Sequence, residues 1–171
     1  MAKQSDADFL GWVSTSRDGL RKTAFLLCGD WFLADDLVQD ALTRLFAVWG
    51  RVSGSGDPAP YARKILVNLY LDHRRRPSRR EVLLAELPDR RAAEQPNSVD
   101  GDRDGLMTAL KQVPAGQRAV LVLRYWDDQS IEQTAQILGT SPSNVRSQAS
   151  RGLDALRAAM SDPMTAPKEA P

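Results

Sequence analysis

Basic and aromatic side chains gather between residues 61 and 80, in a pattern suited to a nucleic-acid backbone. This stretch holds seven lysine or arginine residues and one aspartate, a net charge of +6. Tyr61 and Tyr70 offer faces on which bases can stack, and Asn68 adds a hydrogen-bonding amide although asparagine is a poor helix former. Lys64, Asn68 and Asp72 are each four residues apart, so a helix places them on one face. The predicted contacts are Tyr61, Lys64, Asn68, Arg74, Arg75 and Arg76. The alternative is a solvated basic helix end.

The segment from Asp30 to Asp40 has the opposite charge. It contains four aspartates and no lysine or arginine, a net charge of −4. Asp36 and Asp40 are four apart, and like charges at that spacing cost a helix about 0.2–0.5 kcal/mol. A solvated acidic face explains such a segment as well as a docking site for a basic protein surface does, and both interpretations stay open at this point.

A third cluster of polar side chains follows two consecutive helix signals near the C-terminus. Ser130 and Gln133 have the spacing of a capping box, and Gly139 suits the left-handed residue that ends a helix. Ser141 then supplies an N-cap and Pro142 a first helical residue. A short helix, a glycine turn and a capped second helix predict a helix-turn-helix, whose second helix enters the major groove of DNA.

The outward face of that second helix carries side chains that contact base edges and phosphates. An apolar stripe of Val145, Ala149, Leu153 and Leu156 predicts which face is buried. Gly152 is expected to bend or shorten the end of the helix. The alternative is an ordinary helical hairpin with a solvated polar face. The predicted DNA contacts are Asn144, Arg146, Ser147, Gln148, Ser150 and Arg151.

Helices are the elements that must position these clusters. Apolar residues recur at helical spacing on both sides of residues 88–105, a charged, proline-containing stretch with one large aliphatic residue. We therefore expect an all-α protein of two small helical domains, separate bodies joined by a flexible linker. Within the first domain, the glycines and prolines of residues 50–60 predict a loop between the second and third helices.

Composition excludes several classes of function. The chain has 171 residues, 42% of them hydrophobic, and neither an 18-residue apolar run nor a secretory signal pattern. Cys28 is the single cysteine, expected to be a small buried apolar group, so no disulfide framework or cysteine-rich zinc site is available. No nucleotide-binding, zinc-protease or serine-hydrolase motif occurs. We expect a cytoplasmic protein that is not an enzyme and needs no cofactor or metal.

The order of these parts resembles the extracytoplasmic-function (ECF) RNA polymerase sigma factors, and within them the actinobacterial branch. The resemblance rests on the acidic helix of residues 34–40, the glycine-rich loop, the helix of residues 61–68, the polar linker and the C-terminal helix-turn-helix. It implies sigma domain 2 over residues 7–76, a flexible linker over 77–104, sigma domain 4 over 105–158 and a disordered tail over 159–171.

The resemblance also assigns partners and roles. Sigma factors bind core RNA polymerase and direct it to promoter DNA, and an anti-sigma factor is expected to cover both domains. Asp35, Asp36, Gln39 and Asp40 match the segment that docks on the β′ clamp helices of the polymerase. Val52 and Ser53 match the loop that captures an extruded base of the −10 strand, with Asn68 beside it, and Arg146, Ser147, Gln148 and Arg151 match positions that read the −35 duplex.

Val52 departs from the large side chain that relatives often carry in that loop.

Two other classes of function compete with the sigma factor. A stand-alone helix-turn-helix repressor would explain the second domain and leave the basic helix unused, and a helical adaptor would explain the linker alone. Only the sigma factor interpretation requires binding to core polymerase.

Overall fold

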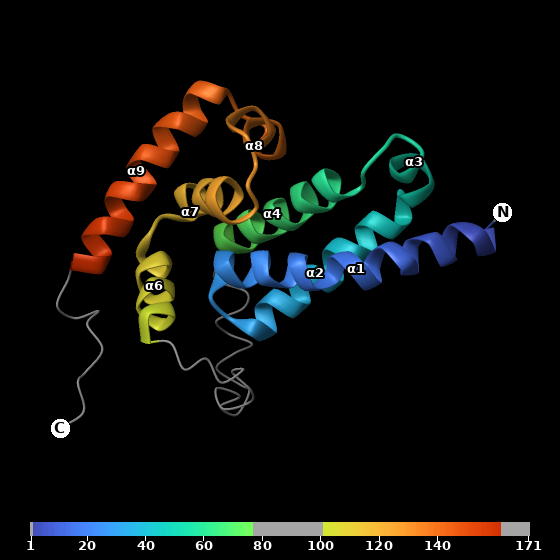
Figure 1. Ribbon diagram of the computed structural model, residues 1–171, viewed down its shortest axis with the longest axis horizontal. Helices are drawn as coiled ribbons and strands as arrows, with labels where there is room; N and C mark the ends of the chain where they lie inside the picture. Colours follow the sequence, from blue (N-terminus) through green and yellow to red (C-terminus); the bar gives the residue numbers. More distant parts are fainter. Residues whose placement is uncertain (1, 77–100, 162–171) are drawn as a thin grey trace.

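The computed structural model describes residues 2–76 and 101–161, and every regular element in these two ranges is a helix, which confirms the all-α prediction (Figure 1). Among these helices, none has the length and apolar character that a membrane crossing requires. The N-terminal domain consists of α1 (Ala2–Cys28), α2 (Trp31–Ala47), α3 (Trp49–Ser53) and α4 (Ala59–Arg75). Helices α1, α2 and α4 pack side by side into a bundle, with α3 at its far end (Figure 1).

The C-terminal domain consists of shorter helices that end in one long helix. In chain order they are α6 (Gly101–Gln112), α7 (Ala115–Leu121), the π-helical turn η1 (Val122–Trp126), α8 (Ile131–Leu138) and α9 (Pro142–Ser161). Helix α9 packs against α6, α7 and α8. Helix α6 begins at Gly101, four residues before residue 105, where the sequence predicted this domain to start. Thr108 donates a hydrogen bond to the carbonyl oxygen of Asp104 in the first turns of α6.

The core of the N-terminal domain is formed by the predicted apolar stripes. Leu27 of α1, Leu45 of α2 and Leu66 of α4 are fully buried. Phe46, the next residue along α2, is 49% exposed, and its ring centroid lies 5.0 Å from that of Phe9. The period of α2 places Leu45, not Phe46, toward the centre of the bundle, which leaves an aromatic side chain at the surface.

The predicted glycine-rich loop is partly helical, which corrects the placement of Val52 and Ser53. Both lie in α3, and Val52 is 7% exposed. Trp49 and Val52 are three residues apart, so one turn of helix buries both side chains against the bundle. The Ser53 hydroxyl donates to the carbonyl oxygen of Trp49 at 2.8 Å. Val52 is therefore a core residue in this structure, and the loop proper begins at Gly54.

The helix-turn-helix is built as its sequence signals predict. Ser130 Oγ accepts from Gln133 N at 3.0 Å, and Gln133 Oε1 accepts from Ser130 N at 2.8 Å, which completes the capping box. Gly139 ends α8 at φ 63° and ψ 40°, the left-handed conformation that glycine adopts without a steric penalty. Ser141 Oγ then accepts from Asn144 N at 3.1 Å at the start of α9.

Gly152 does not shorten α9, contrary to the sequence-based expectation. The helix continues unbroken to Ser161, and Gly152 is buried where α9 meets α7. A Cβ atom at Gly152 would lie 3.1 Å from Leu121 Cγ and 3.2 Å from its Cδ1. The missing side chain therefore lets the two helices approach closely, which offsets the lower helix propensity of glycine.

Gly152→Val is expected to destabilise the C-terminal domain. Valine would place three carbon atoms in a gap that is already tight for one, and overpacking of this kind costs roughly 1–3 kcal/mol. Urea unfolding followed by circular dichroism measures the change. Gly11→Val is the matched control, because a Cβ atom at Gly11 meets nothing within 4 Å. Equal losses of stability in the two variants would contradict the close-approach role of Gly152.

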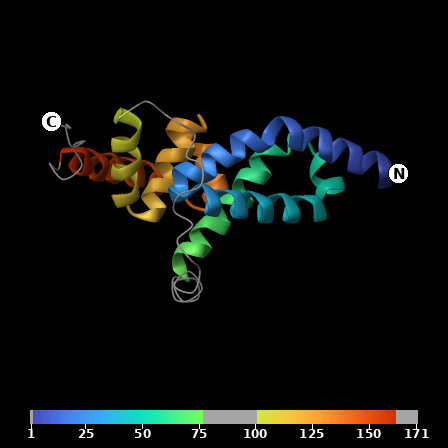
Figure 2. The same ribbon diagram turned by 90° about the horizontal axis from the view of Figure 1, so that it is seen from below.

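The two domains pack against each other, which corrects the expectation of separate bodies. Helix α4 contacts α7 and α8, and α1 contacts α6, α7 and η1 (Figures 1 and 2). Val122, Leu123 and Ile137 of the C-terminal domain belong to the same buried cluster as Leu27 and Leu66 of the N-terminal domain. The main core is therefore shared by the two domains, and a smaller cluster of Val120, Ala135 and Val145 lies within the C-terminal domain.

The predicted linker and tail lie largely outside the described residues. This applies to residues 77–100 of the linker and to residues 162–171 of the tail. Residues 101–104 belong to α6 and residues 159–161 to α9, so both segments begin or end within helices.

Candidate nucleic-acid and protein interfaces

One exposed face of α2 combines acidic and aromatic side chains. Asp36, Gln39 and Asp40 are all exposed, as the sequence predicted, and Phe32 on the preceding turn is 49% exposed. Asp30 differs from the other aspartates of this segment because it caps the helix: its Oδ1 accepts from Phe32 N at 2.8 Å and from Leu33 N at 3.1 Å. The face available to a partner is therefore acidic at its centre and apolar at its N-terminal end.

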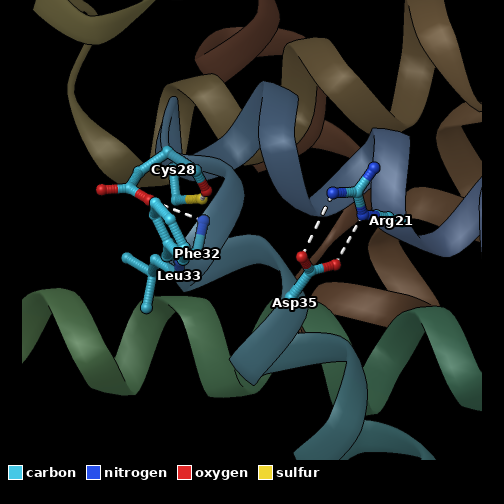
Figure 3. A network of polar contacts seen from close by, with 6 residues as sticks. Arg21, Cys28, Phe32, Leu33 and Asp35 are labelled. Carbon is cyan, nitrogen blue, oxygen red and sulfur yellow. Dashed lines mark hydrogen bonds and ion pairs between the residues drawn. The ribbon is translucent and has the colours of Figure 1, made fainter. Parts of the chain in front are cut away.

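Asp35 is held by an ion pair within the domain. Arg21 of α1 donates from Nε to Oδ1 at 2.5 Å and from an Nη atom to Oδ2 at 3.1 Å (Figure 3). The same guanidinium lies 4.3 Å from the ring centroid of Trp31, which stacks on Phe25. Hydrogen bonding to Arg21 lowers the pKa of Asp35. Asp35 therefore joins α1 to α2, in contrast to the outward-facing Asp36 and Asp40.

The exposed face of α4 carries the predicted polar row. Lys64, Asn68 and Asp72 are exposed along one side, and Tyr61 at the start of the helix is 37% exposed. The basic side chains at the other end, Arg74, Arg75 and Arg76, are exposed as well. Arg75 lies 3.8 Å from Asp72, a surface ion pair of little energetic weight. Cations at a helix C-terminus are also favoured by the helix dipole.

Two side chains that the sequence grouped with this basic face point elsewhere. Tyr70 is fully buried, and burial raises the pKa of its hydroxyl, so it cannot stack on a base in this conformation. Arg63 turns toward the C-terminal domain, where its Nε lies 3.5 Å from Asp127 Oδ2. Both positions lie off the Lys64 and Asn68 face because a helix turns by 100° per residue.

The start of α9 presents the predicted DNA-reading side chains. Val145 is fully buried beneath them, and Ala149 and Leu153 are half-buried, as the apolar stripe predicts. Gln148 is half-buried and the other five predicted contacts are exposed: Asn144, Arg146, Ser147, Ser150 and Arg151. The capped N-terminal end of this helix is therefore free to enter a groove.

An open hollow beside α9 includes residues that the sequence did not single out. Arg124 and Tyr125 of η1 line it together with Arg146 and Arg157 of α9. Tyr125 is 61% exposed and Trp126 is 52% exposed. The π-helical turn explains this exposure, because its wider turn shifts the following side chains out of the α-helical register that the sequence pattern assumes.

Cys28 behaves as a structural residue. It is half-buried at the end of α1, and its thiol lies 3.2 Å from the carbonyl oxygen of Asp30 (Figure 3). Burial raises the pKa of the thiol to about 11, so the reactive thiolate is scarce at neutral pH. This agrees with the prediction of a small apolar group.

Comparison with known proteins explains why these faces occur together. Residues 12–80 match the sigma-70 region 2 family and residues 103–156 match sigma-70 region 4. The chain is 35% identical over 157 residues to the RNA polymerase sigma-E factor of Streptomyces antibioticus, covering 92% of this chain and 87% of that protein. The chain belongs to the ECF sigma factors. It is an alternative sigma factor that directs transcription initiation, and a repressor without region 2 is excluded.

Other relatives of this sigma factor agree. The sigma-E factor of Streptomyces coelicolor is 33% identical, with 88% of this chain and 84% of that protein covered. Two solved structures share the fold. RpoE of Bartonella quintana, bound to the anti-sigma factor NepR, has a TM-score of 0.73 and 24% sequence identity, with 90% of this chain and 96% of that chain covered. CnrH, bound to the cytosolic domain of CnrY, has a TM-score of 0.64 and 20% sequence identity, with 92% of each chain covered.

Proposed function

We propose that this sigma factor divides promoter-specific initiation among three helix faces. The exposed face of α2 docks on the β′ clamp helices of core polymerase, α4 captures the −10 non-template strand, and the start of α9 reads the −35 duplex. One observation carries this proposal: three exposed faces lie on three different helices. The face on α2 is acidic, and the faces on α4 and α9 are basic or polar. Because core polymerase works on chromosomal DNA, we place the protein in the cytoplasm.

Charge and exposure support the α2 assignment. Asp36 and Asp40 lie one turn apart on the solvent side, where their mutual repulsion costs free energy in the isolated chain. Basic side chains on a partner would relieve that repulsion, and an exposed aromatic ring at Phe32 offers a neighbouring apolar contact. Asp35 contributes indirectly, since its ion pair with Arg21 fixes α2 against α1.

The α4 assignment follows from its mixture of cations and one amide. Lys64 and the three terminal arginines attract phosphates irrespective of sequence, whereas Asn68 can donate to and accept from the edge of one base. Extruding a base costs a few kcal/mol, which contacts of this kind offset. The protein then needs no catalytic residue, since the polymerase carries out the chemistry of RNA synthesis. Val52, which the family resemblance placed beside this site, is a buried residue of α3.

An anti-sigma factor is the proposed regulator. The two solved structures named above are complexes of a sigma factor with another protein, an anti-sigma factor in the case of RpoE. The exposed aromatic side chains of Tyr125 and Trp126 give such a protein an apolar surface on the C-terminal domain.

Arg146→Ala is expected to impair recognition of the −35 element and thereby to test the α9 assignment. Loss of a contact to a base edge costs about 1–3 kcal/mol and relaxes sequence preference at one position, whereas loss of a phosphate contact weakens all DNA equally and flattens the salt dependence. Transcription with core polymerase from promoters altered singly in the −35 element measures the difference. Arg151→Ala is the companion variant.

Arg103→Ala provides the control, since Arg103 is an exposed arginine of the same domain on α6. This variant is expected to transcribe as the wild-type chain does. Wild-type transcription from every promoter by both Arg146→Ala and Arg151→Ala would show that α9 is not the recognition helix.

A further inference from the structure

Arg21 of α1 binds two side chains on successive turns of α2. Its guanidinium donates hydrogen bonds to both carboxylate oxygens of Asp35, at 2.5 and 3.1 Å (Figure 3). The central carbon atom of the same guanidinium lies 4.3 Å from the ring centroid of Trp31. Trp31 and Asp35 are four residues apart, so they share one side of α2, and a planar guanidinium suits both a carboxylate and an aromatic ring. One residue of α1 therefore holds two turns of α2.

The first turn of α2 depends on contacts of this kind. The buried residues of α2 begin at Ala34, one turn into the helix. Before that point Trp31 is half-buried and stacks on Phe25 of α1, with 4.0 Å between ring centroids and 8° between ring planes. Phe25 lies one turn after Arg21, so one side of α1 faces one side of α2. Arg21 and Phe25 thus hold the end of α2 where burial in the core is incomplete.

The position of Asp35 fixes the direction of the exposed acidic side chains. An α-helix turns by about 100° per residue, so Asp36 lies about 100° and Asp40 about 140° around α2 from Asp35. Asp35 points to α1, whereas Asp36 and Asp40 are exposed, as is Phe32 one turn before Asp36. Rotation of α2 about its own axis would move all three exposed side chains together. The ion pair therefore sets the orientation of the surface that is proposed to meet the polymerase.

Arg21 also balances a negative charge at the edge of that surface. The hydrogen bonds between the two side chains lower the pKa of Asp35 and raise the pKa of Arg21, so both are ionised at neutral pH. Loss of Arg21 would leave the Asp35 carboxylate without its hydrogen-bonded cation and make α2 more attractive to a basic partner. The same loss would release the first turn of α2. The electrostatic effect strengthens docking and the loss of orientation weakens it, so the sign of the change shows which role Arg21 has.

We propose that Arg21 is a positioning residue for polymerase binding. By holding Asp35 and Trp31, it keeps the exposed acidic surface of α2 directed at the clamp helices. This inference rests on the proposed docking of α2 on core polymerase. Asp35 then serves the orientation of α2 and makes no contact with the polymerase, in contrast to the role that the family resemblance assigned to it. Arg21, which lies outside the acidic segment, becomes a determinant of affinity.

Arg21→Ala is expected to weaken binding to core polymerase about three- to tenfold, the size expected for loss of an ion pair and a cation–π contact. Calorimetric titration of the full-length chain with core polymerase measures the affinity, and circular dichroism is expected to stay helical. Arg17→Ala is the matched control, because Arg17 is exposed one turn earlier on α1 and its charge also lowers the pKa of Asp35. This control is expected to bind as tightly as the wild-type chain or more tightly. Wild-type or tighter binding by Arg21→Ala would overturn the proposal.

Exchange of the two charges tests whether Asp35 acts through Arg21. Arg21→Asp with Asp35→Arg keeps the net charge, and an arginine at position 35 stays one turn from Trp31, where it can stack on the ring. The affinity is expected to return to within about twofold of the wild-type value, whereas Asp35→Arg alone sets two cations against each other and is expected to lose about tenfold. A swapped chain that binds as weakly as Asp35→Arg does would show that the polymerase contacts Asp35 directly, and would also overturn the proposal.

The variant that combines Asp36→Arg and Asp40→Arg, titrated in parallel, separates failure of this inference from failure of the docking proposal. Normal binding by that variant would refute the docking of α2 and, with it, the role of Arg21. Weakened binding by that variant together with wild-type binding by Arg21→Ala would refute the positioning role alone.

Discussion

Asp36→Arg together with Asp40→Arg is expected to weaken binding to core polymerase by at least about 100-fold, which corresponds to about 2.7 kcal/mol. The two substitutions replace attraction by repulsion at the proposed contact with basic clamp helices, and like-charge juxtaposition across an interface costs several kcal/mol. Both side chains are exposed, so the fold is expected to stay helical by circular dichroism. Size-exclusion co-elution at moderate salt measures the binding.

The control for this variant carries the same change in net charge at another place. Asp18 on α1 and Asp104 on α6 are exposed, and Asp18→Arg with Asp104→Arg is expected to leave co-elution unchanged. Wild-type co-elution by the α2 double variant, or equal losses in the two double variants, would refute the docking role of α2 and point to a general effect of charge.

Asn68→Ala is expected to separate promoter opening from promoter binding. It removes the hydrogen bonds of one amide, worth about 1 kcal/mol, so open-complex formation is expected to fall several-fold to about tenfold. The basic residues of α4 remain, and affinity for the closed complex is therefore expected to persist. Permanganate reactivity of unpaired thymines measures opening, and retardation on a native gel measures binding.

A promoter with a mismatched bubble at the −10 element is expected to rescue Asn68→Ala, since most of the unpairing cost is absent. Lys64→Ala provides the contrast. Loss of a phosphate contact lowers the affinity for every template, and it reduces the slope of log affinity against log salt concentration by about one. Wild-type opening by Asn68→Ala on duplex DNA, or loss of binding on all templates, would contradict the strand-capture role. Val52→Gly is expected to loosen the packing of α3, because the Val52 side chain is buried.

Local signals in the sequence were sufficient for the helix-turn-helix. Ser130, Gln133 and Gly139 act through hydrogen bonds and backbone angles within a few residues, so the sequence alone specifies their geometry. The exposed rows on α2 and α4 were equally predictable, because helical period decides which side chains share a face. Boundaries were less predictable, as α3 shows: a single turn of helix that buries Trp49 and Val52 overrides the loop signal of the neighbouring glycines.

Contacts between distant segments could not be predicted from local patterns. Thr23 and Asp127 are 104 residues apart, and Arg118 and Leu27 are 91 residues apart. No spacing rule links such residues, and the polar composition between the domains favoured independent bodies. Burial of Tyr70 had the same cause, since the surface that covers α4 comes partly from the C-terminal domain.

Site-specific photocross-linking tests the division of labour among the three helices most directly. A photoreactive amino acid replaces Asp36, Lys64 or Arg146 in turn, and each full-length chain is assembled with core polymerase and promoter DNA before irradiation. We expect position 36 to cross-link to the β′ subunit, position 64 to the −10 strand and position 146 to the −35 duplex. Cross-linking of position 36 to DNA, or of positions 64 and 146 to polymerase alone, would contradict this division of labour.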